Sequence, residues 1–132
     1  MSNSKNPYLE NKQTLLRTLA MPADANPSGD IFGGWIMSQM DIAGASYARQ
    51  IAQSRVVTIA VEAMTFLLPV YVGDEVSCYC ETEKIGRTSV AVKIETWVRR
   101  DRLTDESIKV TEAVYTYVSI DENRNPKPLP KD

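Results

Sequence analysis

The feature that most restricts the fold of this chain is one long helical stretch, residues 34–52, which contains no proline and no cluster of turn-forming residues. At 1.5 Å per residue such a helix is about 28 Å long, which is longer than the average helix of a globular protein. Apolar side chains occupy nearly its whole circumference: Trp35, Ile36, Met37, Met40, Ile42, Ala43, Ala45, Ala48 and Ile51. Because a helix that is apolar on most sides is buried on most sides, we expect it at the centre of the molecule.

The segments around this helix have the patterns of β-strands. A strand is predicted at 13–21, where it stops before Pro22, and the residues up to 30 form a loop rich in turn formers. After the helix we predict strands at 56–66, 75–83, 89–100 and 107–120, with turns around Pro69 and Gly73 and at 84–88. One strand, one long helix and then four strands predict an α+β hotdog fold, in which an antiparallel sheet wraps one long central helix.

Alternation within the last two strands predicts which side chains are buried. In 89–100 the inward set is Val90, Val92, Ile94 and Val98, and the outward set is Lys93, Glu95 and Arg99. In 107–120 the inward set is Ile108, Val110, Val114, Val118 and Ile120. We expect a single domain at 13–121, between a flexible tail at 1–12 and a proline-rich extension at 122–132. Since an open sheet exposes an edge that pairs readily with a second copy, we expect at least a homodimer.

The composition excludes several classes of function. A net charge of −2 without a basic block argues against a nucleic-acid partner. The apolar stretches are too often interrupted to span a membrane, and the polar N-terminus lacks the apolar core of a signal peptide, so we expect a cytoplasmic protein without a membrane partner. The chain has no histidine, which removes Ser-His-Asp and Cys-His catalysis and His-ligated metals. Cys78 and Cys80 share one face of a strand, where core packing is favoured over a metal site or a disulfide.

Asp41 is the residue that the apolar helix does not explain. Its neighbours one turn away are Met37, Ser38, Gly44 and Ala45, so no lysine or arginine lies at the spacing of a helical ion pair. A buried carboxylate without partners is costly, so Asp41 needs hydrogen bonds, water or a cleft. Two interpretations are open: a structural contact with a distant group, or a carboxylate that faces a pocket, which the neighbouring glycines favour.

Gly33 and Gly34 stand where this helix begins, and the first backbone N–H groups of a helix have no intrahelical acceptor. Without β-carbons these residues let a ligand oxygen approach the donors, and the helix dipole favours negative charge there. Such a helix start can hold an oxyanion that develops on a carbonyl group, although a glycine pair also forms an ordinary turn. Asn26, in the preceding loop, either orders the loop by local hydrogen bonds or uses its amide to orient water or a carbonyl.

The stretch from Gly86 to Ser89 predicts a tight turn at the start of a strand. Arg87, Thr88 and Ser89, together with backbone N–H groups, would suit a phosphate-bearing ligand. A plain hairpin turn is the equal alternative.

Two segments resemble a known family: residues 16–48, LRTLAMPADANPSGDIFGGWIMSQMDIAGASYA, and residues 56–76, VVTIAVEAMTFLLPVYVGDEV. They are similar to the acyl-CoA thioesterases of the hotdog fold, in particular the bacterial YciA-like branch, and the likeness runs from about Leu15 to Leu129. The distinctive motif is Asn-x-x-Gly-Asp-Ile-Phe-Gly-Gly-Trp, followed by an aspartate seven residues after its last glycine. The resemblance implies hydrolysis of acyl-CoA thioesters to free acid and CoA, without a metal or another cofactor.

The resemblance also implies roles for individual residues. Asp41 matches the family's catalytic carboxylate, and Asn26 matches its catalytic amide. Asp41 would act as a general base on water or, less favoured, as a nucleophile through an anhydride. The helix start that meets the thioester carbonyl corresponds to Gly33 and Gly34. Residues expected to contact CoA are Phe66, Gly86, Arg87, Thr88 and Ser89, and Phe66 is also a candidate, with Met37, Met40, Tyr47 and Met64, for an acyl tunnel or the core.

In this family the active site lies at a dimer interface and the assembly is commonly a trimer of dimers, so Asn26 and Asp41 of one site can come from different subunits. Two other functions remain open on the sequence. A non-catalytic module that binds or senses acyl-CoA would share the fold but has little use for an unpaired carboxylate. A dehydratase or hydratase of acyl thioesters usually depends on a histidine, which this chain lacks. We therefore expect an acyl-CoA thioesterase.

Overall fold

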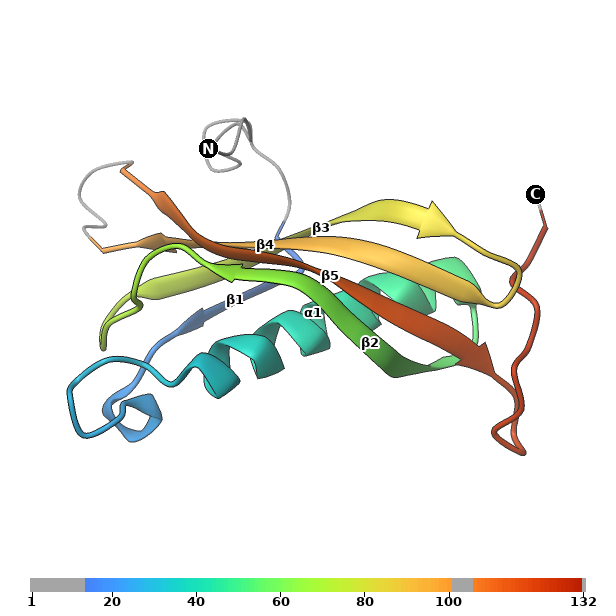
Figure 1. Ribbon diagram of the computed structural model, residues 1–132, viewed down its shortest axis with the longest axis horizontal. Coiled ribbons are helices and arrows are strands. Elements are labelled where there is room, and N and C mark those ends of the chain that lie inside the picture. The colour runs from blue at the N-terminus through green and yellow to red at the C-terminus, as the bar shows by residue number, and fades with distance from the viewer. Residues whose placement is uncertain (1–13, 101–105, 132) are drawn as a thin grey trace.

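A computed structural model describes residues 14–100 and 106–131 of the 132-residue chain. Within these ranges one long helix lies along one face of a five-stranded sheet (Figure 1). The elements are β1 (Leu16–Leu19), the short 3₁₀ helix η1 (Pro22–Asp24), α1 (Gly33–Ala52), β2 (Arg55–Phe66), β3 (Glu75–Ile85), β4 (Ser89–Arg99) and β5 (Ile108–Ile120). The predicted helix and all five predicted strands are present, although the first strand is shorter than predicted. The expected tail at 1–12 lies outside the described residues.

The strands are antiparallel neighbours in the order β1-β3-β4-β5-β2. The hydrophobic core lies between this sheet and α1, whose buried residues are Ile36, Met40, Ala43, Gly44, Ala48 and Ala52. On β4 the alternation holds as predicted, because the inward set is buried and the outward set is only partly buried. The single helix on a single sheet is the arrangement that the order of elements predicted.

The expectation that α1 is buried on most sides is wrong for the single chain. The sheet covers the helix from one side only, so Met37 and Ile42 are 37% and 55% exposed. Those apolar side chains remain at the surface of the chain.

The predicted inward set of β5 is also partly wrong, because a β-bulge changes the phase of the strand. Thr111 pairs with Thr96, and Lys109 pairs with Trp97, so Val110 is an extra residue on β5. Beyond the bulge the buried face consists of Thr111, Ala113, Tyr115, Tyr117 and Ser119, and Ile120 at the end of the strand is buried as predicted. Val114 and Val118, which we expected to be buried, lie on the opposite face and are only partly covered. The bulge therefore turns two tyrosines toward α1.

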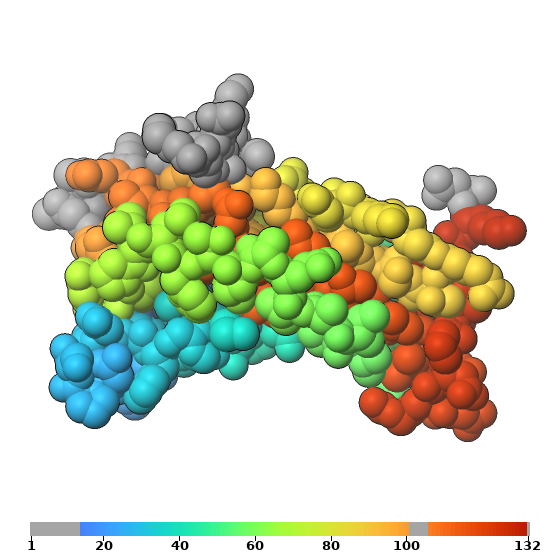
Figure 2. All heavy atoms as spheres, viewed as in Figure 1, coloured from blue at the N-terminus to red at the C-terminus, as the bar shows by residue number. Residues whose placement is uncertain are grey.

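β2 is an edge strand that pairs with β5 on one side only, and it runs across the side of the molecule shown in Figure 2. Its apolar residues Ile59, Val61 and Phe66 are 58%, 39% and 48% exposed. A long apolar edge of this kind readily pairs with a strand of another chain.

Neither helix of the described part of the chain is long and apolar enough to cross a membrane.

Cys78 and Cys80 both face the core side of β3, opposite Thr96 and Ile94 of β4, as predicted. Burial raises the pKa of the Cys78 thiol to about 11 and that of the Cys80 thiol to about 12. Both cysteines are free, and their thiols are protonated at neutral pH, which suits a packing role. Among the described residues no cluster of acidic, cysteine or histidine side chains could hold a metal ion.

Candidate active site

Asp41 lies in the third turn of α1, and two hydroxyl groups from the sheet reach its carboxylate. Thr58 of β2 donates a hydrogen bond from Oγ1 to Oδ1 of Asp41 at 2.7 Å. Tyr117 of β5 donates its phenolic hydrogen to the same Oδ1 at 3.0 Å and to the main-chain oxygen of Asp41 at 3.1 Å. Thr58 and Tyr117 are direct cross-strand partners, so the register between β2 and β5 brings the two hydroxyls together.

The second carboxylate oxygen of Asp41 is left open. Within residues 14–100 and 106–131, Oδ2 accepts no hydrogen bond, and no lysine or arginine nitrogen lies within 4.0 Å of the carboxylate. Asp41 is also only partly buried. One oxygen is therefore fixed by two neutral donors, while the other remains available to a ligand or to water.

Thr58 and Tyr117 are functional candidates that the sequence did not reveal. Both belong to strands with many hydroxyl and aromatic residues, and nothing in their spacing separates them from neighbours such as Thr65 or Tyr115. Only the bulge on β5 decides that Tyr117 faces the helix. The open question about Asp41 is thus partly answered: it has distant structural partners, but they are neutral, and they leave half of the carboxylate unoccupied.

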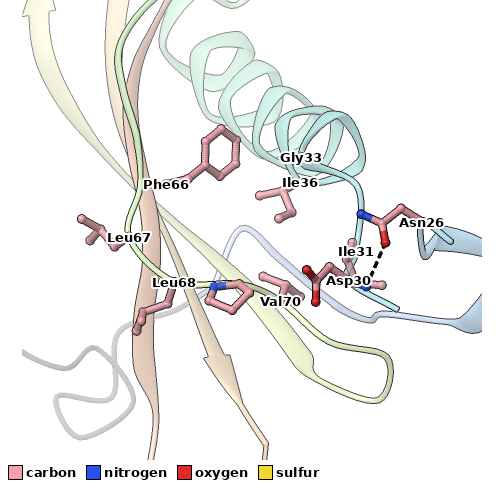
Figure 3. Close-up of a pocket in the computed structure, with 10 residues that line it drawn as sticks. Asn26, Asp30, Ile31, Gly33, Ile36, Phe66, Leu67, Leu68 and Val70 are labelled. Carbon is pink, nitrogen blue, oxygen red and sulfur yellow. Dashed lines mark hydrogen bonds between the residues drawn. The ribbon is translucent and has the colours of Figure 1, made fainter. Parts of the chain in front are cut away.

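Asn26 and Gly33 line a cavity of about 380 Å³ at the N-terminal end of α1 (Figure 3). The side-chain oxygen of Asn26 accepts hydrogen bonds from the backbone N–H groups of Ser28 at 2.9 Å and Asp30 at 3.1 Å. Both proposed uses of Asn26 are therefore compatible: its oxygen orders the loop, and its Nδ2 group forms no hydrogen bond within the described residues. The ring of Phe66 lies on the opposite wall of the cavity (Figure 3).

The start of α1 has no side-chain cap. Phe32 occupies the N-cap position and makes no capping hydrogen bond through its side chain. The backbone N–H groups of Gly33 and Gly34 form no hydrogen bond with other described residues. A β-carbon on Gly34 would meet no atom within 4 Å, whereas one on Gly33 would touch the Phe66 ring at 3.4 Å. Packing within the chain therefore does not require glycine at position 34.

The predicted turn at Gly86–Ser89 is present, and the C-terminal segment packs against it. The backbone N–H of Gly86 donates to Ser89 O at 2.9 Å, and that of Leu129 donates to Arg87 O at 2.9 Å. Between the turn and residues 128–131 lies a cavity of about 490 Å³, and Arg87 and Lys131 are among the residues that line it. The proline-rich extension thus adds a second cation beside Arg87.

Within one chain the predicted site residues fall into three separate places. Asn26, Gly33 and Phe66 share the cavity at the start of α1, and Gly34 lies next to it in the chain. Asp41 does not line that cavity, since it lies two turns further along α1. The turn at 86–89 lies at the far end of the sheet, away from the loop that holds Asn26 (Figure 1). Phe66, expected to contact CoA together with this turn, therefore lies with Asn26 instead.

Comparison with known proteins places this chain in a family. The family model described as the thioesterase superfamily matches residues 28–104. The chain is 54% identical over 120 residues to the acyl-CoA thioester hydrolase YciA of Salmonella typhimurium, an alignment that covers 89% of this chain and 90% of the relative.

Two solved structures have the same fold. The hexameric thioesterase y2039 from Yersinia pestis superposes with a TM-score of 0.85 at 54% identity, covering 92% of this chain and 98% of the other. The hexameric hotdog fold thioesterase Cj0915 of Campylobacter jejuni superposes with a TM-score of 0.84 at 42% identity, covering 90% and 91%. The fold is therefore the predicted hotdog fold, and the chain belongs to the thioesterase superfamily.

Proposed function

We infer that this chain hydrolyses acyl-CoA thioesters to a free carboxylic acid and CoA. The observation that carries the inference is the carboxylate of Asp41, which has no cationic partner within the described residues and whose Oδ2 is unoccupied. The names of the relatives reported above, which include an acyl-CoA thioester hydrolase, support the same chemistry. An ion pair would make a carboxylate a weaker base, and within the described residues Asp41 has no such pair.

In the proposed reaction Asp41 acts as a general base. Its open Oδ2 takes a proton from a water molecule while the water oxygen attacks the thioester carbonyl carbon. The carbon–oxygen double bond opens to a tetrahedral oxyanion, which collapses and breaks the carbon–sulfur bond. The CoA thiolate leaves and takes up the proton that Oδ2 of Asp41 accepted from the water, which restores the carboxylate, so that one water is consumed for each acid and each thiol formed. Attack by Asp41 itself to give an anhydride is the less favoured alternative.

The oxyanion would be held at the start of α1. Three hydrogen-bond donors are available to it near the cavity at the start of α1: the uncapped N–H groups of Gly33 and Gly34 and the free Nδ2 group of Asn26. The absence of a β-carbon at Gly34, which packing within the chain does not demand, leaves room for the carbonyl oxygen. Loss of one such donor typically costs roughly 3 kcal/mol of transition-state stabilisation.

A complete site requires a second copy of the chain. Asp41 does not reach the cavity of Asn26 in one protomer, and the exposed apolar edge of β2 is suited to pairing with a partner. We place Asp41 of the partner subunit opposite Asn26, with a trimer of dimers as the assembly, in keeping with the hexamers named among the related structures. Phosphate groups of CoA would contact Arg87, Thr88 and Ser89, and Phe66 would contact the thioester arm of the ligand. The expected location remains the cytoplasm.

The activity is tested by measuring thiol release from acyl-CoAs of increasing chain length. Wild-type protein should release CoA, and the Asp41→Asn variant should not, while a matched neutralisation of an exposed acid, Glu122→Gln, should leave the rate unchanged. Binding of acyl-CoA without thiol release over hours would favour a binding module instead. Turnover by Asp41→Asn at the wild-type rate would exclude the mechanism.

The two-subunit site is tested by mixing two inactive variants, Asn26→Ala and Asp41→Asn, and refolding them together. If the two residues of one site come from different subunits, random mixed dimers hold one intact site each, which restores about one quarter of the wild-type sites. If both residues come from the same subunit, no mixed dimer holds an intact site and the mixture stays inactive.

A further inference from the structure

Tyr117 connects β5 to the carboxylate of Asp41 through the core. Its side chain is 1% exposed, and its hydroxyl lies within hydrogen-bond distance of both Oδ1 and the main-chain oxygen of Asp41. One phenolic hydrogen is therefore shared between the carboxylate and the backbone of the same residue. This geometry restrains the side chain of Asp41 relative to the helix that carries it.

Gly44 provides the space that Tyr117 needs. Residues 41 and 44 lie on the same face of α1, one turn apart. A β-carbon on Gly44 would lie 2.2 Å from the Tyr117 hydroxyl oxygen, 2.7 Å from Cδ1 of Ile94 and 2.9 Å from Cζ of Tyr117. Glycine is less favourable than alanine inside a helix, so its presence here calls for a reason. The close approach of Tyr117 to Asp41 supplies one.

The Tyr117 hydroxyl is a donor throughout the neutral pH range. Burial, followed by the charge of Asp41 and the hydrogen bond to it, raises the pKa of Tyr117 well above its ordinary value. The proton therefore stays on the phenol, and the hydrogen bond to the carboxylate persists.

We propose that Tyr117 is a positioning residue, which holds Oδ1 of Asp41 against the helix so that Oδ2 points to the reacting water, and that Gly44 is present to admit it. The proposal rests on the proposed hydrolase function and assigns Tyr117 no contact with substrate. Thr58 donates to the same Oδ1 from the other strand of the pair. With one oxygen held from two directions, the carboxylate loses the rotation that would exchange its two oxygens.

The groups around Asp41 and its hydrogen-bond partners come from β2, β3, β4 and β5. β2 contributes Thr58, and β5 contributes Tyr115 and Tyr117. On β3, Cys78 contributes to the raised pKa of Tyr115, and Cys80 contributes to the raised pKa of Tyr117. β4 contributes the apolar Ile94 beside Gly44. None of these groups is a cation, so no positive charge among them would compensate the carboxylate for the hydrogen bond lost in Tyr117→Phe.

Tyr115 supplies a matched control on the same strand. Its ring stacks with that of Tyr117 at a centroid distance of 6.4 Å, and it is equally buried. Its hydroxyl donates to the main-chain oxygen of Met37 at 2.9 Å and makes no hydrogen bond to Asp41. Tyr115→Phe and Tyr117→Phe therefore each remove one buried hydroxyl that bonds the helix, but only the second removes a donor to the carboxylate.

The test compares kcat and KM of the two variants for one acyl-CoA. Tyr117→Phe should lower kcat about 10- to 100-fold with KM little changed, because a hydrogen bond to a charged group is lost while substrate contacts remain. Tyr115→Phe, which keeps both donors to the Asp41 carboxylate, should change neither kcat nor KM.

Gly44→Ala provides a second route to the same effect, because the new β-carbon displaces the Tyr117 hydroxyl. Its loss of kcat should match that of Tyr117→Phe, and the double variant should be little worse than either single one. Independent, multiplying losses in the double variant would contradict a shared path through Tyr117. Oligomeric mass and melting temperature of each variant show whether a loss of activity reflects unfolding.

A spectroscopic measurement without turnover separates this proposal from the hydrolase function. The carboxyl-carbon resonance of ¹³C-labelled Asp41, assigned with Asp41→Asn, should shift in Tyr117→Phe, which loses one donor to Oδ1, but not in Tyr115→Phe. If wild-type protein hydrolyses acyl-CoA but Tyr117→Phe keeps its kcat and its Asp41 resonance, the role of Tyr117 is refuted and the hydrolase function stands. If wild-type protein releases no thiol, the hydrolase function fails, and an unchanged Asp41 resonance in Tyr117→Phe would refute the anchoring of Asp41 as well.

Discussion

Replacing Gly44 by alanine is a small change for which the structure predicts a large loss of stability. In an exposed helix the substitution would stabilise the fold by about 1 kcal/mol. Here the added methyl group would stand 2.2 Å from the Tyr117 hydroxyl and 2.7 Å from Ile94 Cδ1, so both groups would have to retreat by about 1 Å to reach ordinary contact. Both side chains are enclosed in the core, which leaves them little room to do so.

Two costs therefore oppose the helix propensity. Overpacking of a core site costs about 1–3 kcal/mol. A buried hydroxyl that loses its partners costs about 1–3 kcal/mol more, because Tyr117 would move out of reach of Asp41. After the gain in helix propensity is subtracted from these two costs, the free energy of unfolding should fall by about 1–5 kcal/mol. The melting temperature should fall by roughly 3–5 °C for each kcal/mol of stability lost.

The assay is thermal and urea unfolding of wild-type protein and variants at one protein concentration, because assembly adds to apparent stability. Gly34→Ala is the matched control in the same helix, since its β-carbon meets no atom within 4 Å, and it should be as stable as wild type or up to about 1 kcal/mol more stable. Combining Gly44→Ala with Tyr117→Phe should recover part of the loss, because the 2.2 Å contact disappears. A Gly44→Ala protein as stable as wild type would refute the argument that glycine is needed for Tyr117.

Three further predictions concern the rest of the molecule. Burial raises the pKa of Cys78 to about 11 and that of Cys80 to about 12, from an ordinary 9.0. Because both thiols are neutral below pH 9, their burial contributes fully to the stability of the folded state there. This contribution should be lost as the pH rises from 9 toward 12. At pH 8 the thiols of native protein should react with iodoacetamide far more slowly than those of urea-unfolded protein, and equal rates would contradict the burial. Arg87→Gln should raise KM about tenfold for an acyl-CoA but not for the matching acyl-pantetheine, which lacks the nucleotide phosphates, and an equal change for both esters would exclude a phosphate contact. Ile59→Asp, at an exposed position of the β2 edge, should reduce the oligomeric mass measured by light scattering without unfolding the chain, whereas an unchanged mass would place the interface elsewhere.

The site could be read from the sequence only in part. Asp41 stood out because its near neighbours in the helix offer no cation, which is a local property that sequence spacing reports well. Asn26 and Gly33 share one cavity, because only a short loop separates them in the chain, while their predicted roles stay predictions. Thr58 and Tyr117 were not found, because a hydroxyl on a strand becomes a carboxylate partner only through cross-strand register and the position of a bulge.

The sequence by itself determined the helix, the strands and their order, because hydrophobic periodicity, turn formers and proline act over a few residues and leave a direct record in the chain. It also determined that no acid–base chemistry could depend on an imidazole, since histidine is absent. Only the tertiary structure decided which face of β5 meets the helix. There one extra residue at Val110 reverses the alternation and sends Tyr117, rather than Val118, toward Asp41. Such a shift arises from pairing between distant strands, and no local pattern of side chains encodes it.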